Sequence, residues 1–291
     1  MPNHVTNILT ITGPEELVAR IKSEIAGEYE DGEPRFIDFN KIVPRPDTLN
    51  ITSGSSTSNG IAILKWRAGD PSDIRKIMEF NWATEFATED DLITHMCDKG
   101  LANLEEAQKA LDNVRLYGHQ DWYSWSNANW GTKWNAYSQS SDEGSNEIAF
   151  ETAWSTPYPV IEALSRKYPE AVISMRYADE DFGHNCGEYT FQAGDLVEEY
   201  TPEGGSNEAH ELAADIQGSP EWFLDRLYEI EAETADELED YEINSIRYVY
   251  DKGVLDEFPK VVLEVMEQMA VQDENYEFAE RIKNTIAVNE E

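Results

Sequence analysis

The chain has 291 residues, with 22 Lys+Arg against 59 Asp+Glu and a formal net charge of −37 at pH 7. This charge excludes sequence-independent binding to DNA or RNA, because a phosphate backbone needs a clustered cationic face. It disfavours an anionic membrane surface for the same reason. Hydrophobic residues make up 40% of the chain and aromatic residues 11%, which is enough apolar material for a packed core.

The remaining composition points to the cytoplasm. No apolar run approaches the roughly 20 residues that span a bilayer, and the first residues show no secretion signal. Cys97 and Cys186 are too few for a disulfide framework and lack the spacing of a metal site. We therefore expect both cysteines to be buried, reduced thiols.

The N-terminal part predicts a strand, a helix and a second strand. Residues His4–Thr12 are rich in β-branched side chains and are stopped by Gly13. A helical pattern then runs from Pro14 to Gly27, with apolar residues on one face. Residues Phe36–Val43 alternate weakly, as a second strand would.

The middle of the chain, Pro44–Ser145, reads as a large, mainly helical insertion. It opens with small polar residues at Thr52–Asn59, which predict a mobile loop. Three helices are expected after this loop, at Ser72–Ala83, Thr88–Asp98 and Asn103–Tyr117. Each begins with a residue that can cap a helix N-terminus, namely Ser72, Thr88 and Asn103.

A second strand–helix–strand unit follows the insertion. Residues Glu147–Trp154 predict a strand, Pro157 opens a helix, and Ala171–Tyr177 predict another strand. Residues Gly187–Gln192 and Leu196–Tyr200 form a predicted hairpin with a tight turn at 193–195. Without the insertion, this order predicts an α+β fold, a ferredoxin-like split βαβ antiparallel sheet.

The C-terminal region is predicted to be helical. A hinge at Pro202–Ser206 separates a domain at 1–201, with its insertion at 44–145, from an acidic helical region at 202–291. Helix breaks are expected at Gly218-Ser219-Pro220, Gly253 and Pro259. The last segment, Pro259–Ala287, predicts a helical hairpin with its turn at Asp273-Glu274-Asn275.

Negative charge is concentrated in Asp179–Glu242, which we call the acidic segment. It contains 21 Asp+Glu and a single basic residue, Arg226, whereas the insertion holds 15 acidic and 9 basic residues. A solvated surface that serves solubility or high salt would spread its charge more evenly, so the uneven distribution favours docking on a basic face of another protein. The candidate partner-binding residues are Asp179, Glu180, Asp181, Glu198, Glu199, Glu229, Glu231, Glu233, Asp236, Glu237, Glu239 and Asp240.

Four tryptophans lie close together in the segment 121–137, among Asn and Ser residues. Two interpretations are open for Trp122, Trp125, Trp130 and Trp134. They could line a pocket that stacks bases or sugars, although Lys133 is the only cation in the segment. Alternatively, the indoles seal the insertion against the sheet as a core plug, and the Asn side chains bond the backbone.

Catalytic patterns are missing from the sequence. It has no Gly-rich phosphate loop, no Gly-x-Ser-x-Gly elbow and no His-Glu-x-x-His pair. The one metal-like arrangement, His184 and Cys186 near Asp179 and Asp181, lacks a second ligand pair. We therefore expect a protein that is not an enzyme, with no catalytic residues, no cofactor and no metal.

Three stretches together resemble the YubB-like family of phage- and plasmid-encoded proteins. They are Met1–Gly13, Trp130–Tyr137 and Phe150–Val160, in the same order. The resemblance covers about residues 1–201 and implies a ferredoxin-like domain, a mobile-element origin and no established enzymatic activity. Separately, residues 262–286 resemble the UVR motif, a short helical hairpin through which some repair and protease-adaptor proteins bind partners.

These observations lead to one main functional hypothesis and two alternatives. The main one is a phage- or plasmid-encoded acidic protein that inhibits a host nucleic-acid-handling complex of anti-phage defence. It would occlude the basic surface of that complex by DNA mimicry, in the host cytoplasm, without binding nucleic acid or membrane itself. The alternatives are an enzyme that binds a small ligand or nucleotide through the Trp-rich segment, and a structural protein that forms homo-oligomers through its terminal hairpin.

Overall fold

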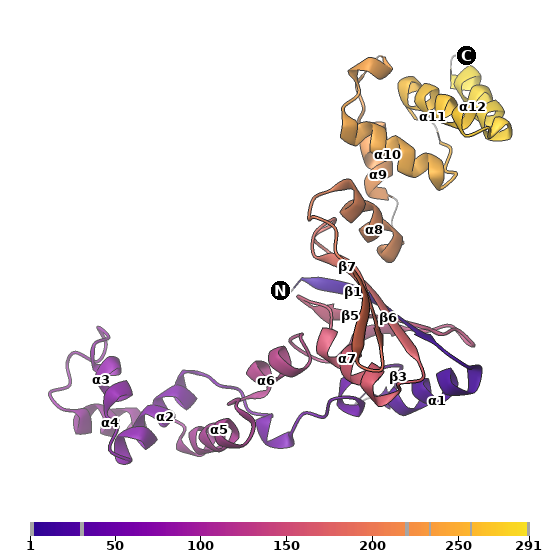
Figure 1. Ribbon diagram of the computed structural model, residues 1–291. Coiled ribbons are helices and arrows are strands. Elements are labelled where there is room, and N and C mark those ends of the chain that lie inside the picture. Colours follow the sequence, from indigo (N-terminus) through magenta and orange to yellow (C-terminus); the bar gives the residue numbers. More distant parts are fainter. Residues whose placement is uncertain (1–2, 30–31, 219–220, 233, 257, 290–291) are drawn as a thin grey trace. The chain divides into compact units, whose positions relative to one another are not determined.

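The computed structural model describes residues 3–29, 32–218, 221–232, 234–256 and 258–289 (Figure 1). The chain divides into two compact units. One comprises residues 1–10, 174–190 and 196–291, and the other comprises residues 11–173 and 191–195. The sequence-based division at residues 201 and 202 stays a prediction.

A six-stranded sheet forms the centre of the fold, in the order β4-β5-β1-β6-β7-β8. Its strands are β1 (His4–Thr12), β4 (Tyr137–Ser140), β5 (Glu147–Ala153), β6 (Val172–Asp179), β7 (Cys186–Gln192) and β8 (Asp195–Tyr200). Helix α7 (Tyr158–Lys167) connects β5 to β6, and β1 lies between these two strands. This is the split βαβ arrangement, so the predicted α+β fold is confirmed.

Strand β1 shows why the N-terminal residues form a strand. Burial alternates along it with a period of two, and its buried positions are Val5, Asn7, Leu9 and Ile11. This alternation places one set of side chains in the core. The predicted helix after β1 is α1 (Glu15–Ile25), which buries apolar residues on one face.

The predicted hairpin at the end of the sheet is confirmed as β7 and β8. Its two turn residues, Ala193 and Gly194, have φ values of 54° and 86°. Two consecutive residues in the left-handed region are typical of a type I′ turn, whose twist matches that of the flanking strands. Strand β8 is the last strand in the sheet order, and all six of its residues are exposed.

The strand expected at 36–43 is wrong. The structure has a short strand β3 (Pro34–Arg35), paired with β2 (Gly27–Glu28), and then a 3-10 helix η1 (Phe39–Lys41). Side-chain amides from a distant segment take the place of a neighbouring strand. The N–H of Ile37 donates to Gln139 Oε1, and the N–H of Phe39 donates to Asn135 Oδ1, each at 2.9 Å.

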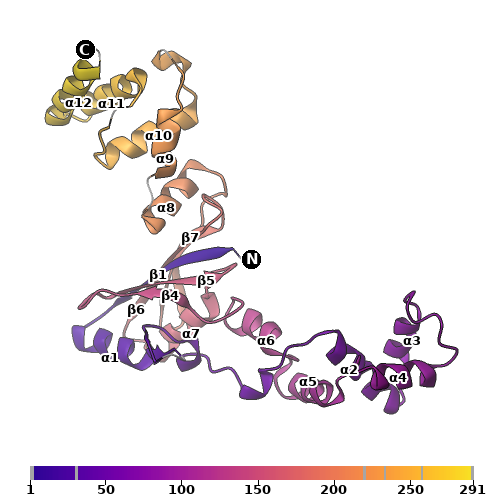
Figure 2. The same cartoon turned by 180° about the vertical axis from the view of Figure 1, so that it is seen from behind.

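Four helices of the insertion follow one another along the chain (Figure 2), and the first three supply most of one buried apolar cluster. They are α2 (Ser55–Arg67), α3 (Ser72–Met78), α4 (Glu89–Asp98) and α5 (Leu104–Tyr117). The predicted caps Thr88 and Asn103 are confirmed, because their side chains accept the N–H groups of Asp91 and Glu106. Ser72 is not a cap, since Pro71 takes that position without a side-chain hydrogen bond.

The loop expected at 52–59 is wrong, because α2 begins at Ser55. The small residues of this stretch serve helix packing. A Cβ added to Gly60 would lie 2.5 Å from the carbonyl oxygen of Asn103 and 2.7 Å from Ala107 Cβ. The buried Thr57 hydroxyl donates to Glu106 Oε2 at 3.1 Å. Helices α2 and α5 are therefore in close contact at Thr57 and Gly60.

The two cysteines differ in their surroundings. Cys97 is exposed, so its predicted burial is wrong. Cys186 is buried and its Sγ lies 3.4 Å from the carbonyl oxygen of Ala209. Burial raises the pKa of the Cys186 thiol above its usual value, which keeps it protonated.

The C-terminal helices pack around a second apolar cluster. The elements after the sheet are α8 (Asn207–Gln217), α9 (Glu221–Tyr228), η3 (Ala235–Glu237), α10 (Asp240–Asp251), α11 (Lys260–Gln272) and α12 (Tyr276–Asn289). The predicted terminal hairpin is confirmed as α11 and α12, and its turn contains Glu274 with φ 55° (Figure 1). Gly218 ends α8 as expected, while the predicted break residues Ser219 and Pro220 lie outside the described residues.

Helix α8 is attached to the sheet by small and apolar side chains. Ala209, Ala213 and Ile216 of α8 share a buried cluster with Ala178 and Cys186 of β6 and β7. Its N-terminus is capped by Ser206, whose hydroxyl accepts the N–H of Ala209. None of the helices in the described ranges combines the length and apolar character that a bilayer crossing requires.

The remaining short elements lie at the two ends of the insertion. A 3-10 helix η2 (Asp47–Leu49) follows the first part of the sheet domain. Helix α6 (Trp122–Asn129) precedes β4 and carries the first half of the Trp-rich segment. Asp121 caps α6, because its carboxylate accepts the N–H of Ser124 at 2.8 Å. The sequence did not single out either element.

Candidate functional site

The acidic segment lies on the β6–β7 loop, on β7 and β8, on α8 and on the chain from α9 into α10. Most of its predicted partner-binding residues are exposed. These are Glu180, Asp181, Glu198, Glu199, Glu229, Glu231, Asp236, Glu237 and Glu239. Glu233 and the side chain of Asp240 lie outside the described residues.

Asp179 differs from the other predicted docking residues because its side chain is buried, with 3% exposure. Its carboxylate accepts hydrogen bonds from Asn3 Nδ2 at 3.0 Å, Asn185 Nδ2 at 2.8 Å and the N–H of Asp181 at 2.9 Å. These bonds close the β6–β7 loop against the N-terminal residues. A carboxylate that accepts several N–H groups in the interior stabilises local structure. The prediction that Asp179 is an exposed partner-binding residue is therefore wrong.

Ion pairs within the acidic segment draw on cations from outside it. Arg176 pairs with Glu188 at 2.8 Å, and Lys252 pairs with Asp215 at 2.5 Å. Both cations lie beyond the ends of the segment. The single basic residue inside it, Arg226, is half-buried. Neighbouring elements therefore supply part of the charge compensation of the segment.

Crowding of negative charge is visible at Glu211 on α8. Partial burial raises the pKa of this carboxyl above its ordinary value, and the carboxylates of Glu208, Asp215 and Asp251 raise it further. Lys252 acts in the opposite direction. Neighbouring like charges disfavour the ionised form, so this part of α8 has more negative charge than its surroundings compensate.

The Trp-rich segment is largely a core element. Trp130 is 1% exposed, and its indole N–H donates to the carbonyl oxygen of Val43 at 2.8 Å. Its ring packs edge-on against Phe39 and Trp125, at centroid distances of 5.8 Å and 5.6 Å. Trp125 is also buried. For these two residues, the burial favours the core-plug interpretation, because no ring face is left for a stacked ligand.

Asparagine side chains in the same segment bond the backbone. Asn127 Nδ2 donates to the carbonyl oxygen of Tyr123 at 2.8 Å, and Asn129 Nδ2 donates to that of Trp125 at 2.9 Å. Each bond joins two residues of α6 that are one helical turn apart. The polar residues among the tryptophans therefore serve the helix, as the core-plug interpretation expects.

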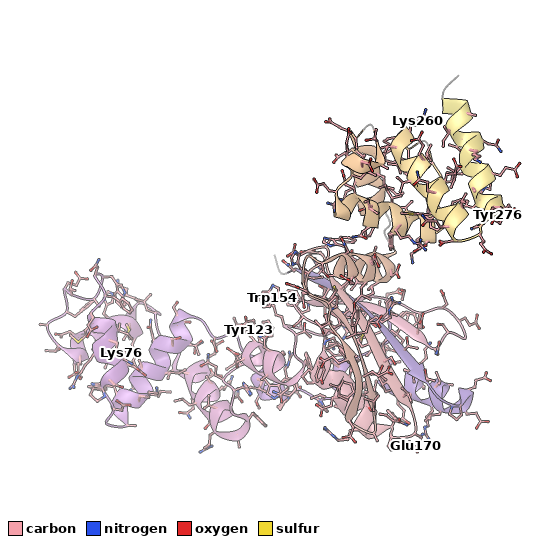
Figure 3. All side chains as sticks on the ribbon, turned by 45° about the horizontal axis from the view of Figure 1, so that its top comes forward. Lys76, Tyr123, Trp154, Glu170, Lys260 and Tyr276 are labelled. Carbon is pink, nitrogen blue, oxygen red and sulfur yellow. The ribbon has the colours of Figure 1, made fainter. Side chains whose placement is uncertain are left out.

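The other two predicted tryptophans, Trp122 and Trp134, are half-buried. Near them, Trp154 and Tyr123 are 41% and 42% exposed, and their rings meet edge-on at 6.4 Å (Figure 3). The Lys133 ammonium lies 4.4 Å from the Trp134 ring centroid and 4.8 Å from that of Trp154. Both distances are typical of cation–π contacts, so Lys133 is already engaged by two rings.

Trp154 also has an unusual backbone, with φ 72°. A bulky residue in the left-handed region is strained and persists only where its surroundings hold it. The neighbouring Ala153 is held on both sides by Thr132, whose hydroxyl donates to the Ala153 carbonyl and accepts its N–H. The Ser155 hydroxyl bonds the Gly131 carbonyl. Sequence analysis missed this turn because nothing in a Trp residue signals a positive φ.

The metal-like arrangement of the sequence does not form a site. His184 is exposed, Cys186 is buried, and the Asp179 carboxylate is occupied by amide groups. Across the described parts of the chain, no three or more His, Cys, Asp or Glu side chains are grouped so that they could hold a metal ion.

The sheet with its β7–β8 hairpin and the crossover helix α7 define a ferredoxin-like α+β domain. Residues 133–219 match the family model DUF1281_C, described as the ferredoxin-like domain in Api92-like protein. The match includes the stretch at 150–160, one of the three on which the YubB-like resemblance rests, whereas residues 1–13 lie outside it. No curated protein matches the chain.

Among solved structures, the crystal structure of protein Api92 from Yersinia pseudotuberculosis is similar to this chain at 14% sequence identity. The alignment covers 71% of this chain and 100% of that chain, with a TM-score of 0.35.

Proposed function

We propose that this chain is an acidic binding protein that docks on the basic, nucleic-acid-binding surface of another protein and occludes it. The observation that carries the proposal is the exposure of carboxylates along the acidic segment. They are Glu198 and Glu199 on β8, and Glu229, Glu231, Asp236, Glu237 and Glu239 between α9 and α10. The acidic segment has a net charge of 1 − 21 = −20, which is more than half of the −37 of the chain, whereas the longer insertion has 9 − 15 = −6.

The chemistry of recognition follows from what basic surfaces bind. Arginine and lysine side chains that hold phosphate oxygens form charge-assisted hydrogen bonds with carboxylate oxygens as well. A dense set of carboxylates therefore competes with polynucleotide for the same cations. Opposite charge on the two proteins also accelerates their encounter, an effect that falls with ionic strength.

The origin of the protein and the class of protein that it inhibits are proposed from the resemblances. The YubB-like resemblance supports a phage or plasmid origin, and for such an element an anti-phage defence complex is the target whose inhibition is useful. The UVR-like hairpin of α11 and α12 supports a second contact with a protein partner. Trp125 and Trp130 give no support to a ligand pocket in the Trp-rich segment, because both are core residues. Self-assembly stays a prediction, which light scattering of the full chain decides.

The test is capture of partners by the full chain at low and at moderate salt, followed by elution with double-stranded DNA. We expect some proteins to be retained at low salt and displaced by DNA. Their affinity for the chain should fall at least about tenfold at moderate salt. A variant carrying Glu198→Gln, Glu199→Gln, Glu237→Gln and Glu239→Gln should lose them. The matched control neutralises four exposed carboxylates of the insertion, with Glu79→Gln, Glu85→Gln, Asp90→Asn and Asp98→Asn.

Two results would contradict the proposal. One is a captured protein that both variants retain equally, since the position of the charge would then be irrelevant. The other is retention that resists DNA and salt, because the contact would then not involve a nucleic-acid-binding surface. Identification of the retained proteins by mass spectrometry tests the defence-complex assignment separately.

A further inference from the structure

Strand β8 is the outermost strand of the sheet and has no cover on either face. It follows β7 at the end of the strand order, and all six of its residues, Asp195–Tyr200, are exposed. An edge strand presents a row of backbone N–H and C=O groups on its outer side, to which another strand can be added. Native proteins usually blunt such an edge with proline, a bulge or a covering element.

The turn geometry indicates which backbone groups face outward. In a hairpin with a two-residue type I′ turn, the residues that flank the turn form a hydrogen-bonded pair, and such pairs then alternate along the strands. Asp195, Val197 and Glu199 therefore direct their backbone groups toward β7. The N–H and C=O groups of Leu196 and Glu198 point away from it, whereas the carbonyl oxygen of Tyr200 lies beside Gly187 of β7.

The side chains of β8 combine apolar and acidic groups. Leu196, Val197 and Tyr200 are 41%, 51% and 48% exposed, which is unusual for large apolar residues on one short strand. A hollow of about 470 Å³ lies along the strand, lined by Glu188, Tyr189, Thr190 and residues 197–200. Carboxylates from Glu188, Glu198 and Glu199 border this hollow.

We propose that β8 binds an extended basic segment of a partner protein as an additional strand of the sheet. This inference rests on the proposed function, because it takes the partner to be a basic protein, and it names the element and the mode of contact. Backbone hydrogen bonds to Leu196 and Glu198 hold the added strand. Lysine or arginine side chains of the added strand pair with Asp195 and Glu199 on one face of the sheet. The alternate, apolar side chains pack against Leu196 and Tyr200 on the other face.

Charge selects a basic segment over a second copy of β8. Each β8 strand carries three acidic residues, Asp195, Glu198 and Glu199, and no basic one. Two such strands side by side would place like charges within reach of each other across the ladder, which is destabilising. Acidic side chains on the edge therefore oppose self-pairing, and the same side chains attract a cationic strand.

The test uses the full chain and a labelled peptide of about eight residues that alternates lysine and valine. A second peptide carries the same side chains but is N-methylated at alternate residues, so that it keeps its charge and loses the donors on one edge. We expect the N-methylated peptide to bind at least about tenfold more weakly. Hydrogen exchange should slow at the amides of Leu196 and Glu198 when the unmodified peptide binds.

A matched pair of variants separates position from charge. Glu198→Gln with Glu199→Gln should weaken binding of the unmodified peptide, whereas Glu79→Gln with Glu85→Gln, the same charge change at exposed positions of the insertion, should not. Equal binding of the two peptides, with unchanged exchange in β8, would overturn strand addition and leave acidic docking intact. Failure of both peptides to bind at about 1 mM would also overturn it. The DNA-displaceable capture described above decides the proposed function independently.

Discussion

At Gly60, the absence of a side chain sets the distance between two helices. The carbonyl oxygen of Asn103 and the methyl group of Ala107 occupy the positions beside its Cα. The backbone at Gly60 is ordinary helix, so glycine is needed there for space and not for its conformational freedom. Any Cβ would have to move α5 or bend α2.

We expect Gly60→Ala to lower the free energy of unfolding by about 1–3 kcal/mol, because the new methyl group would overlap a backbone carbonyl. Chemical denaturation followed by tryptophan fluorescence measures this change. Ser55→Ala, at an exposed position of the same helix, is the control and should stay within about 0.5 kcal/mol. Equal behaviour of the two variants would show that the helices are not in close contact at Gly60.

Glu211 gives a residue-scale prediction for pH. Its pKa is raised in the folded protein by partial burial and by the neighbouring carboxylates of Glu208, Asp215 and Asp251. Its protonated form therefore favours folding, and this contribution is lost as the pH rises through the raised pKa. We expect Glu211→Gln to increase the midpoint of thermal unfolding relative to the wild type at neutral pH. This difference between the two proteins should vanish in acid, below the ordinary glutamate pKa.

The control for this titration is Glu203→Gln, which removes an exposed carboxylate from the loop before α8. It should show a smaller difference between neutral and acid conditions. If Glu211→Gln is less stable than the wild type at neutral pH, the carboxylate is stabilising the fold and the assignment is wrong.

At the scale of elements, the β7–β8 turn is well suited to its position in all but one residue. Gly194 adopts its φ of 86° without strain, but Ala193 has a Cβ in the left-handed region. For an L-residue with a Cβ, this region costs roughly 1–2 kcal/mol, and asparagine tolerates it best among the residues that have one. Ala193 is exposed, so a larger side chain meets little resistance there.

We therefore expect Ala193→Asn to raise the free energy of unfolding by about 0.5–1 kcal/mol and Ala193→Val to lower it by a similar amount. Chemical denaturation measures both variants. Valine is matched for exposure and differs in its intolerance of a positive φ. A stabilising Ala193→Val would contradict the type I′ assignment.

The elements that could be predicted from the sequence are those with a clear local signal. Strand β1 is rich in β-branched residues and is followed by Gly13, α4 and α5 begin with capping residues, and the β7–β8 hairpin has Gly194 in its turn. The exposed carboxylates were visible as composition. Each of these signals is contained within a few neighbouring residues.

The elements that were missed depend on distant residues. Residues 36–43 lost their strand because the amides of Asn135 and Gln139 bond their backbone, about a hundred positions away in the chain. Helix α2 looked like a loop because its small residues make sense only against α5. The burial of Asp179 depends on Asn3 and Asn185, which no charge count can reveal.

For the whole molecule, a net charge of −37 means that folding brings many like charges together. Self-repulsion destabilises the compact state, and added salt screens it. The denatured chain is more expanded, so it gains less from screening. Stability should therefore depend on ionic strength more than in a protein with balanced charge.

We expect the unfolding temperature at neutral pH to rise by about 2–5 °C between low salt and about 0.3 M NaCl. Near the sequence pI of 4.3, the same addition should have little effect, because the net charge is then close to zero. Calorimetry at both pH values measures the difference. A salt response of equal size at the two pH values would indicate a general solute effect and would rule out relief of repulsion.

The two ends of the insertion are fastened to each other. The side-chain amide nitrogen of Asn113 lies 2.9 Å from the carbonyl oxygen of Thr48 and 3.3 Å from that of Gln120. The chain therefore leaves toward α2 and returns from α5 at neighbouring positions. A lobe joined to the sheet domain in this way can be lengthened, replaced or removed without changing the path of the strands.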